Sequence, residues 1–269
     1  MKYTIGEFAA LLGVTVDTLR LYEKHGIISP MKNDKNQYRY FDDLDARNLL
    51  SSRWLRSLSL SLPEAARLTG DVPLQQITGS LQQAAQTLEA EIREKERQLQ
   101  RLKETNEEIA ALNTRLNQCY FRQMPGFYRL RQTDMNTLLK NEALLQRVSE
   151  WMNSLPFAFF SFRIEQEAIT SEAAIFPYSW GLAMEVDEAA RRQITIDEHI
   201  EIIPPASCLT AVIRGTGDED ITRKSIVFML ENIRGQGLHP DGDVFGKIVL
   251  THRHQGKRWA YLEVNIPVS

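Results

Sequence analysis

The segment from Thr78 to Asn117 contains no proline and, after Gly79, no glycine. Gln, Glu, Arg, Lys and Leu dominate it, which predicts one long helix of about 60 Å at the usual rise per residue. Alternating spacings of three and four residues define a coiled-coil seam. Its positions are Leu81, Ala85, Leu88, Ile92, Lys95, Leu99, Leu102, Asn106, Ile109, Asn113 and Leu116. An isolated helix cannot bury this stripe, so the sequence predicts a homodimer.

A helical hairpin within one chain would also cover the stripe. No turn signal interrupts the run, which disfavours that alternative. The polar seam residues Lys95, Asn106 and Asn113 would lower stability and select register or partner. The periodicity leaves open whether the two helices run parallel or antiparallel.

The amino-terminal residues predict two short helices joined by a glycine turn. Thr4 and Glu7 fit a capping box that opens the first helix, and Gly13 ends it. Thr15 caps a second helix, and Gly26 closes it where a positive φ is often needed. This pattern is a helix-turn-helix, whose second helix enters the DNA major groove. The residues that we expect to face base edges are Thr15, Val16, Asp17, Thr18 and Arg20.

The overall charge excludes a protein that binds nucleic acid through general basicity. The net charge is −3 and the isoelectric point is near 6.0, so DNA contacts require a local basic surface. Residues 18–40 supply one, since five basic residues there oppose two acidic ones. The residues that we expect to hold phosphates and set the docking angle are Tyr22, Lys32, Tyr38, Arg39 and Tyr40.

The helix-turn-helix, the segment Gln37-Tyr-Arg-Tyr-Phe41 and the long helix together resemble the MerR family of bacterial transcription regulators. The family pattern usually reads Gly-Tyr-Arg-x-Tyr here, so Gln37 replaces the glycine while Tyr38 and Arg39 are kept. The resemblance implies a dimeric, winged helix-turn-helix protein with antiparallel long helices. It also implies that the protein twists an overlong promoter spacer so that RNA polymerase engages both promoter hexamers.

After Cys119, aromatic and β-branched residues increase, and Met124-Pro-Gly126 separates a second kind of domain. A strand, helix, strand, strand order is expected twice, which predicts an α+β domain with two pseudosymmetric repeats. The expected segments are 127–132, 135–152, 157–164 and 173–186, then 208–214, 221–234, 244–251 and 259–266. We place a DNA-binding domain at 1–75, a dimerisation helix at 76–119 and this domain at 120–269.

Loop segments of the carboxy-terminal half, in their order, resemble the gyrase-inhibitor-like effector-binding domain of the multidrug-sensing MerR branch. They are Ile203-Pro-Pro-Ala-Ser207, Gly215 and Gly217, Gly235-Gln-Gly-Leu238, Asp243-Val-Phe-Gly246 and Asn265-Ile-Pro-Val268. The resemblance implies a small hydrophobic, cationic ligand. Multidrug-binding members commonly carry a glutamate after the aromatic residue of this motif, where the present chain has Gly246.

Aromatic residues concentrated in this half predict a cavity for large, flat or cationic molecules. The candidates are Trp151, Phe157, Phe159, Tyr178, Trp180, Phe245 and Tyr261, although each one singly could be a core residue. A buried carboxylate could be offset by a lipophilic cation. Glu185 and Glu263 lie in apolar strand runs and are the candidates for that role.

Motifs for catalysis, metals and cofactors are weak or missing. His252 and His254 form a pair without neighbouring cysteine or acidic ligands. Cys119 and Cys208 are far apart and give no disulfide framework. We therefore expect no enzyme activity, no metal and no cofactor; hydrolysis through Glu185 or Glu263 and thiol sensing at Cys119 are weaker alternatives.

The amino terminus has no stretch resembling a signal peptide, and no segment reaches the roughly 18 apolar residues that a membrane span needs. We expect a cytoplasmic protein without a membrane partner. The sequence predicts a dimeric, ligand-responsive transcription activator that binds promoter DNA and works with RNA polymerase. The alternative is a ligand-independent repressor or architectural DNA binder with a carboxy-terminal interaction domain.

Overall fold

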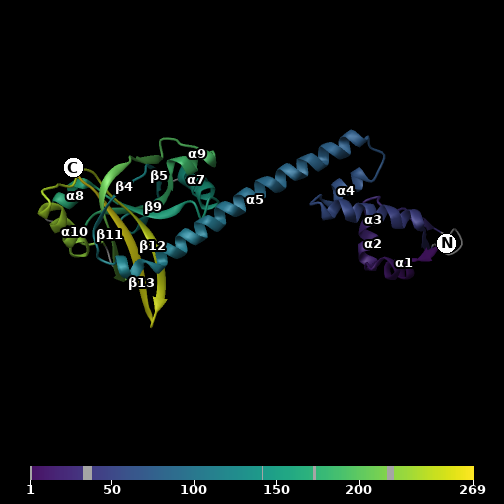
Figure 1. Ribbon diagram of the computed structural model, residues 1–269, viewed down its shortest axis with the longest axis horizontal. Helices are drawn as coiled ribbons and strands as arrows, with labels where there is room; N and C mark the ends of the chain where they lie inside the picture. Colours follow the sequence, from purple (N-terminus) through teal and green to yellow (C-terminus); the bar gives the residue numbers. More distant parts are fainter. Residues whose placement is uncertain (1, 33–37, 141, 172–173, 217–220) are drawn as a thin grey trace. The chain divides into compact units, whose positions relative to one another are not determined.

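The computed structural model describes residues 2–32, 38–140, 142–171, 174–216 and 221–269. The chain divides into two compact units, Met1–Arg97 and Gln98–Ser269 (Figure 1). Two motif residues named above, Gln37 and Gly217, lie outside the described residues.

The first unit begins with the two helices that the capping pattern predicts. Strand β1 (Tyr3–Thr4) leads into α1 (Ile5–Leu12), and α2 (Val16–Lys24) follows. The capping box is present, because the Thr4 side chain accepts the Glu7 amide hydrogen while the Glu7 carboxylate accepts that of Thr4. Gly13, with φ of 62°, ends α1 in the left-handed region that favours glycine.

A small sheet and two further helices complete the fold around α1 and α2. The added elements are β2 (Met31–Lys32), β3 (Arg39–Phe41), α3 (Asp43–Ser57) and α4 (Leu62–Leu68). The strand order is β1-β3-β2, and both pairs are antiparallel. Phe8 stacks on Phe41 with ring centroids 4.8 Å apart. Leu19 and Tyr22 are buried in the same hydrophobic core.

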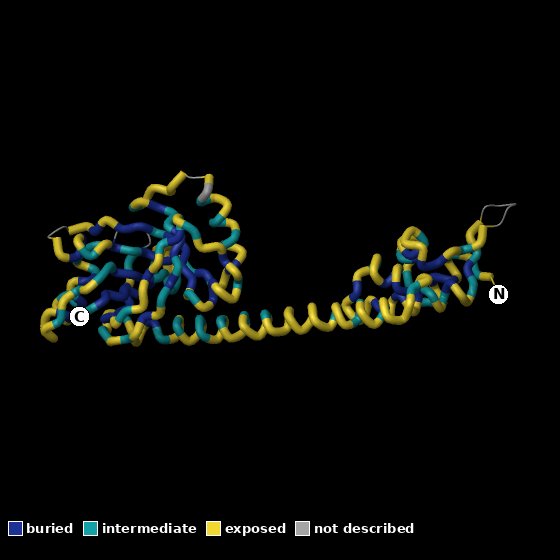
Figure 2. Tube along the Cα trace, turned by 90° about the horizontal axis from the view of Figure 1, so that it is seen from above, coloured by how far each residue is buried: buried dark blue, intermediate teal, exposed yellow. Residues whose placement is uncertain are grey.

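Helix α5 (Leu74–Ala110) is the predicted long helix, with 37 residues. Its seam residues Leu88, Ile92, Leu99 and Leu102 are 44–66% exposed within one chain, and the helix is largely exposed in Figure 2. The helix ends earlier than the expected Asn117. A separate turn, α6 (Leu112–Arg115), follows, and Leu116 packs near Val212 instead of continuing the seam.

An eight-stranded antiparallel sheet organises the second unit. Its order is β10-β5-β9-β8-β12-β13-β11-β4. The strands are β4 (Tyr120–Met124), β5 (Phe127–Arg131), β8 (Phe159–Ile164), β9 (Tyr178–Glu185), β10 (Ile200–Ile203), β11 (Ala206–Thr216), β12 (Val244–His254) and β13 (Lys257–Pro267). Side chains alternate between the two faces of each strand, so one residue step changes the face.

One face of the sheet is covered by the helices α7 (Glu142–Met152), α8 (Gln166–Thr170), α9 (Val186–Arg191) and α10 (Arg223–Gly235). Phe162, Leu262 and Val264 pack there against α8 and α10. The opposite face carries Phe127 and Phe245. It also holds Val212 and Tyr261, which pack against Leu112 of α6.

Three sequence-based assignments differ from the structure. The helix expected over 135–152 begins only at Glu142, because Thr133–Asp134 and Thr137–Leu138 pair as the small strands β6 and β7. The strand expected over 173–186 is confined to Tyr178–Glu185. Its pairing begins at Tyr178, opposite Ile164 of β8, and ends at Glu185, opposite Phe127 of β5. The short strands β4 and β10 were not expected. Among the described residues, no helix has both the length and the apolar character to cross a membrane.

Candidate DNA-binding surface and ligand cavity

The beginning of α2 presents polar side chains at the surface. Thr15, Asp17 and Arg20 are exposed, whereas Val16 and Thr18 are half-buried. The Thr15 hydroxyl accepts the Thr18 amide hydrogen at 3.1 Å, so it is engaged in capping. Arg20 pairs with Asp17 at 3.0 Å, but both side chains are more than two-thirds exposed, which leaves the guanidinium accessible to a competing anion.

Tyr22 does not occupy the exposed position that we expected. Its side chain is 1% exposed and packs in the core with Leu19, because both lie on the apolar stripe of α2. Its hydroxyl accepts a hydrogen bond from the exposed Arg56 at 3.5 Å. Tyr22 therefore positions Arg56, and the arginine is the group that faces solvent.

The residues around β2 and β3 remain at the surface. Lys32 and Tyr38 are exposed, and Tyr40 is half-buried. The Arg39 Nε donates to Glu23 at 2.9 Å, which ties β3 to α2. Lys32 and Arg39 face each other in the strand register, so both cations lie on the same short hairpin.

The predicted ligand residues do not converge on one place. Trp151, Tyr178 and Trp180 lie on the helix-covered side of the sheet, whereas Phe159, Phe245, Tyr261 and Glu263 lie on the opposite side. Trp151 is fully buried against α9 and β5 residues and is a core residue. Phe157 packs against the Arg192 guanidinium, 4.1 Å from its ring centroid, and belongs to neither group.

A cavity of about 730 Å³ opens between α10 and strands β11 to β13 on the helix-covered side. This volume suits a small-molecule site. Of the predicted residues, only Trp180 lines it; the ring packs edge-on against Phe162 and Tyr178, with centroids 5.5 and 5.6 Å away. The other walls, which include Ile213, Ser225, Ile248 and Leu262, were not among the residues expected from the sequence. Strand alternation could have indicated Ile248 and Leu262, which face each other in register.

The charged groups in the described wall of this cavity are basic. Arg214, Lys224 and Arg258 line it together with Thr222 and Ser225. The acidic run Asp218-Glu-Asp220, which comes shortly after Arg214 in the chain, lies outside the described residues. Among the residues that the structure describes, the cavity therefore offers apolar surface, hydroxyl groups and positive charge.

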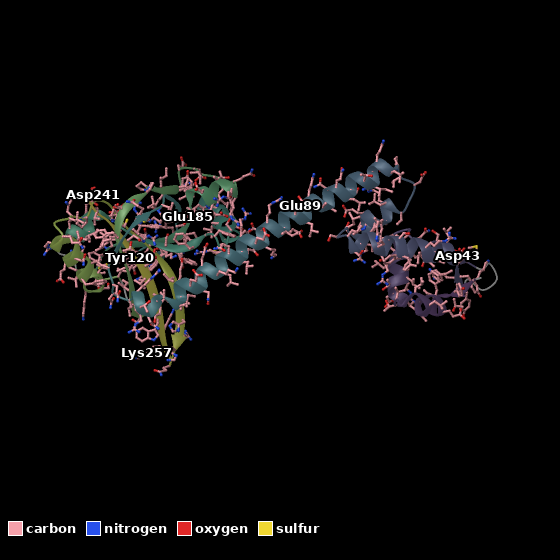
Figure 3. The ribbon with its side chains drawn as sticks, viewed as in Figure 1. Asp43, Glu89, Tyr120, Glu185, Asp241 and Lys257 are labelled. Atoms are coloured by element: carbon pink, nitrogen blue, oxygen red, sulfur yellow. The ribbon has the colours of Figure 1, made fainter. Side chains whose placement is uncertain are left out.

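The two candidate carboxylates lie elsewhere. Glu185 is exposed at the residue before α9 (Figure 3). Glu263 is 8% exposed and accepts a hydrogen bond from Arg122 at 3.1 Å. Because Glu263 follows Leu262 in the strand, it points to the face opposite the cavity. Neither carboxylate therefore lines the cavity beside Trp180.

Gly246 occupies the place where the family resemblance implies a glutamate. A Cβ atom there would lie 2.3 Å from the Phe162 ring and 2.3 Å from the Glu263 carbonyl oxygen. Neither contact leaves room for a side chain. The ring of Phe162 thus fills the space into which a carboxylate at this position would project.

A buried ionic network crosses the opposite face of the sheet. Arg129 is fully buried and donates to Glu201, to the Ser161 hydroxyl and to the Ser179 carbonyl oxygen. Arg163 lies 3.4 Å from the same Glu201 carboxylate. Burial, partly offset by Glu201, lowers the pKa of Arg129. Every charge in this network has a partner, so it is a structural feature.

In the described part of the chain, no group of three His, Cys, Asp or Glu side chains could hold a metal ion. Burial raises the pKa of the Cys208 thiol to about 11 and also raises that of Cys119. Neutral thiols are poor nucleophiles and metal ligands, which argues against thiol sensing.

Residues 3–71 match the model of the MerR HTH family regulatory protein. The first unit therefore carries the helix-turn-helix of a family of DNA-binding transcription regulators. It is similar to the HTH-type transcriptional activator TipA of Streptomyces coelicolor, with 34% identity over 71 residues, which are 26% of this chain. It is also similar to the HTH-type transcriptional regulator ZntR homolog of Haemophilus influenzae, with 36% identity over 64 residues, or 24% of this chain. The chain spans only 28% and 47% of the lengths of these two relatives.

The chain is also similar to solved structures. The EcmrR–DNA complex, determined by cryo-electron microscopy in EcmrR-RPo, is 16% identical, with 99% of each chain covered and a TM-score of 0.39. The amino-terminal part of MtaN, the Bacillus subtilis multidrug transporter activator, is 22% identical, with 39% of this chain and 97% of MtaN covered and a TM-score of 0.35. Both TM-scores are too low to establish a shared overall fold.

Proposed function

We propose that this protein is a dimeric, ligand-responsive transcription activator that binds promoter DNA through its MerR-type unit. The observation that carries the proposal is the family match over residues 3–71. The similarity to TipA, a transcriptional activator, favours activation over repression. In this proposal α2 is the recognition helix and the β2–β3 hairpin is the wing beside it.

The exposed residues divide into base-reading and phosphate-binding groups. Thr15, Asp17 and Arg20 present polar groups for base edges, with Val16 and Thr18 at the border of the helix surface. The groups proposed for phosphate contacts are Lys32, Tyr38, Arg39, Tyr40 and Arg56. Tyr22 supports this surface from the core.

The exposed apolar seam of α5 supports a homodimer, since a second copy would bury it. We propose antiparallel pairing, which would set two DNA-reading units apart. Such a dimer would occupy an overlong promoter spacer and distort it, so that RNA polymerase could engage both promoter elements.

We propose that the second unit is the effector-binding domain, within the boundaries 120–269, and that 76–119 forms the dimerisation helix. The order β5-β9-β8 followed by β12-β13-β11 supports two pseudosymmetric repeats. If the strands of each repeat are numbered in chain order, the sheet order is one, three, two in the first repeat and two, three, one in the second. The two repeats therefore meet at the β8–β12 contact in mirror-related order. A gyrase-inhibitor-like domain would have such internal repetition.

The ligand is proposed to occupy the cavity beside Trp180. Trp180 offers a partly exposed ring for stacking, and Thr222 and Ser225 offer hydroxyl groups. The basic character of the described wall and the remote positions of Glu185 and Glu263 favour an aromatic ligand that is neutral or acidic. This replaces the cationic ligand that the family resemblance implies.

Tryptophan fluorescence titration tests the ligand proposal. The full chain would be titrated with neutral aromatic compounds, aromatic carboxylic acids and lipophilic cations. We expect saturable quenching by the first two classes, most of which is lost in Trp180→Phe. The matched variant Trp259→Phe, whose ring packs under Arg214 outside the walls of this cavity, should retain it. Quenching by cations alone would refute the proposed ligand class.

Transcription in vitro tests the regulatory proposal. A promoter with a long spacer, recovered by selecting DNA that the full chain binds, would be transcribed with and without a quenching compound. We expect transcription to increase only when protein and compound are both present. A decrease that no compound alters would identify the ligand-independent repressor instead.

A further inference from the structure

Strands β12 and β13 continue beyond the rest of the sheet as a two-stranded ribbon. Strand β8 pairs with β12 only as far as Lys247, and β11 pairs with β13 only from Trp259 onward. Among the described residues, those between Arg253 and Arg258 therefore pair only with one another. Figure 1 shows this hairpin extending past its neighbours, and Lys257 marks its end in Figure 3.

Basic side chains face each other across this ribbon. Arg253 is the register partner of Arg258, and His254 is the partner of Lys257. All four are exposed, and the sequence from Thr251 to Leu262 contains no acidic residue. In the part of the chain that the structure describes, no ion pair joins Arg253, Lys257 or Arg258 to a carboxylate. Like charges placed directly opposite each other destabilise a strand pair. A bound polyanion would therefore stabilise this arrangement.

The base of the ribbon adds aromatic rings and a further cation on one face. The Arg214 guanidinium lies 4.7 Å from the centroid of the Trp259 ring. His252 stacks on Tyr261 with centroids 5.9 Å apart. These four side chains, with His254, Gln255 and Lys257, enclose a hollow of about 260 Å³. Such a surface can contact phosphate and sugar groups through both charge and ring packing.

We infer that the ribbon formed by residues 251–259 binds the phosphate backbone of duplex DNA, as a contact separate from the helix-turn-helix. A two-stranded ribbon has dimensions that a DNA groove admits. An acidic protein surface would satisfy the charge as well. DNA is favoured because the inference rests on the proposed function, in which the first unit tethers the same molecule to promoter DNA and raises the local DNA concentration.

The experiment measures the salt dependence of DNA binding by the full chain. Fluorescence anisotropy would follow binding to a selected promoter duplex and to a mixed-sequence duplex. The double variant Arg253→Gln, Lys257→Gln, neither of which lines the proposed ligand cavity, is compared with a charge-matched control, Lys140→Gln, Arg234→Gln, whose two side chains are exposed elsewhere in the same unit. Each lost phosphate contact should reduce the slope of log affinity against log salt by about 0.9. We therefore expect a decrease of about 2 per chain for the ribbon variant and none for the control.

A second readout locates the contact directly. Gln255→Cys at the ribbon turn would carry a photoreactive azide, with the unsubstituted chain treated identically to measure labelling at Cys119 and Cys208. We expect cross-links from position 255 to DNA. Cross-links to a second protein chain, with none to DNA, would overturn the inference.

The outcomes separate the inference from the proposed function. If the ribbon variant has an unchanged salt slope and still binds the selected duplex, the inferred ribbon contact is wrong. The proposed regulatory function is not contradicted by this result. If binding to mixed-sequence DNA depends on the ribbon and no particular sequence can be selected, the inferred ribbon contact is supported. The proposed promoter-specific function is then contradicted. Equal losses in the ribbon variant and its control would show a general charge effect and overturn the inference.

Discussion

The Lys247 ammonium lies 3.0 Å from each of the two carboxylate oxygens of Glu108, which joins strand β12 to the last turns of α5. The two side chains are 17% and 29% exposed. Lys247 is also the register partner of Glu263, whose carboxylate is held by Arg122. This pair is a direct connection between the sheet of the second unit and the helix that we propose dimerises.

Removing this connection should weaken both stability and signalling. For Lys247→Met we expect a loss of about 1 kcal/mol in the free energy of unfolding, because an ion pair that is partly exposed is partly screened by water. Ligand-dependent transcription should decrease more than ligand binding does. Urea denaturation and fluorescence titration would measure the two effects. The exposed pair Glu89–Arg93, at 3.8 Å, provides a control in Glu89→Gln (Figure 3); an equal loss there would contradict this assignment.

Arg129 should be essential for the stability of the second unit. For Arg129→Met we expect a loss of about 3–5 kcal/mol, because Glu201 and the Ser179 carbonyl would lose a buried donor. Arg47→Met is the matched control, since Arg47 and Asp43 are 71% and 80% exposed and such pairs contribute less than about 1 kcal/mol. Denaturant unfolding measures both. The double variant Arg129→Met, Glu201→Gln should be more stable than the single one; no recovery would mean that lost packing, not charge, dominates.

A side chain at position 246 should not be tolerated. Gly246→Ala would place a methyl group against Phe162 and the Glu263 backbone, and overpacking of this kind costs about 1–3 kcal/mol or more. Gly235→Ala is the control, because Gly235 is helical and a Cβ there meets nothing within 4 Å. Thermal unfolding would compare them. A Gly246→Ala protein as stable as the control would show that Phe162 moves aside, and a carboxylate at this position would become feasible.

Acid should destabilise the first unit through its capping boxes. Hydrogen bonds from the Thr4 and Ser61 hydroxyl groups lower the pKa of Glu7 and Glu64 below the ordinary value of 4.5. A carboxyl with a lowered folded pKa adds stability above its unfolded pKa, and this is lost as pH falls through the folded value. We expect melting temperature to fall with acidification below about pH 4.5, and less steeply in Glu7→Gln, Glu64→Gln. Identical pH dependence in the two proteins would contradict the role of these boxes.

Local signals identified the elements of the first unit because their information lies within a few neighbouring residues. The capping box at Thr4, the glycine at position 13 and the cap at Thr15 each form hydrogen bonds or backbone conformations within one helical turn. The absence of proline across α5 is equally local. Tyr22 is the exception, since its aromatic ring suits both a core and a phosphate contact, and only packing against Leu19 and Phe41 decides between them.

The carboxy-terminal site could not be assembled from sequence because it depends on pairing between distant strands. Alternation shows that Leu262 and Glu263 point to opposite faces, but not which face is covered by α10 and contains the cavity. In the folded sheet, Trp180 lies on the opposite face from Phe159 and Phe245. Glu263 lies beside Arg122, which is 141 residues away in the chain. Sequence by itself determined the helix-turn-helix, the long amphipathic helix and the strand-rich second half, through short-range hydrogen bonding and periodicity. The tertiary structure alone decided which side chains share a face, because strand order and register are set by contacts that no local pattern encodes.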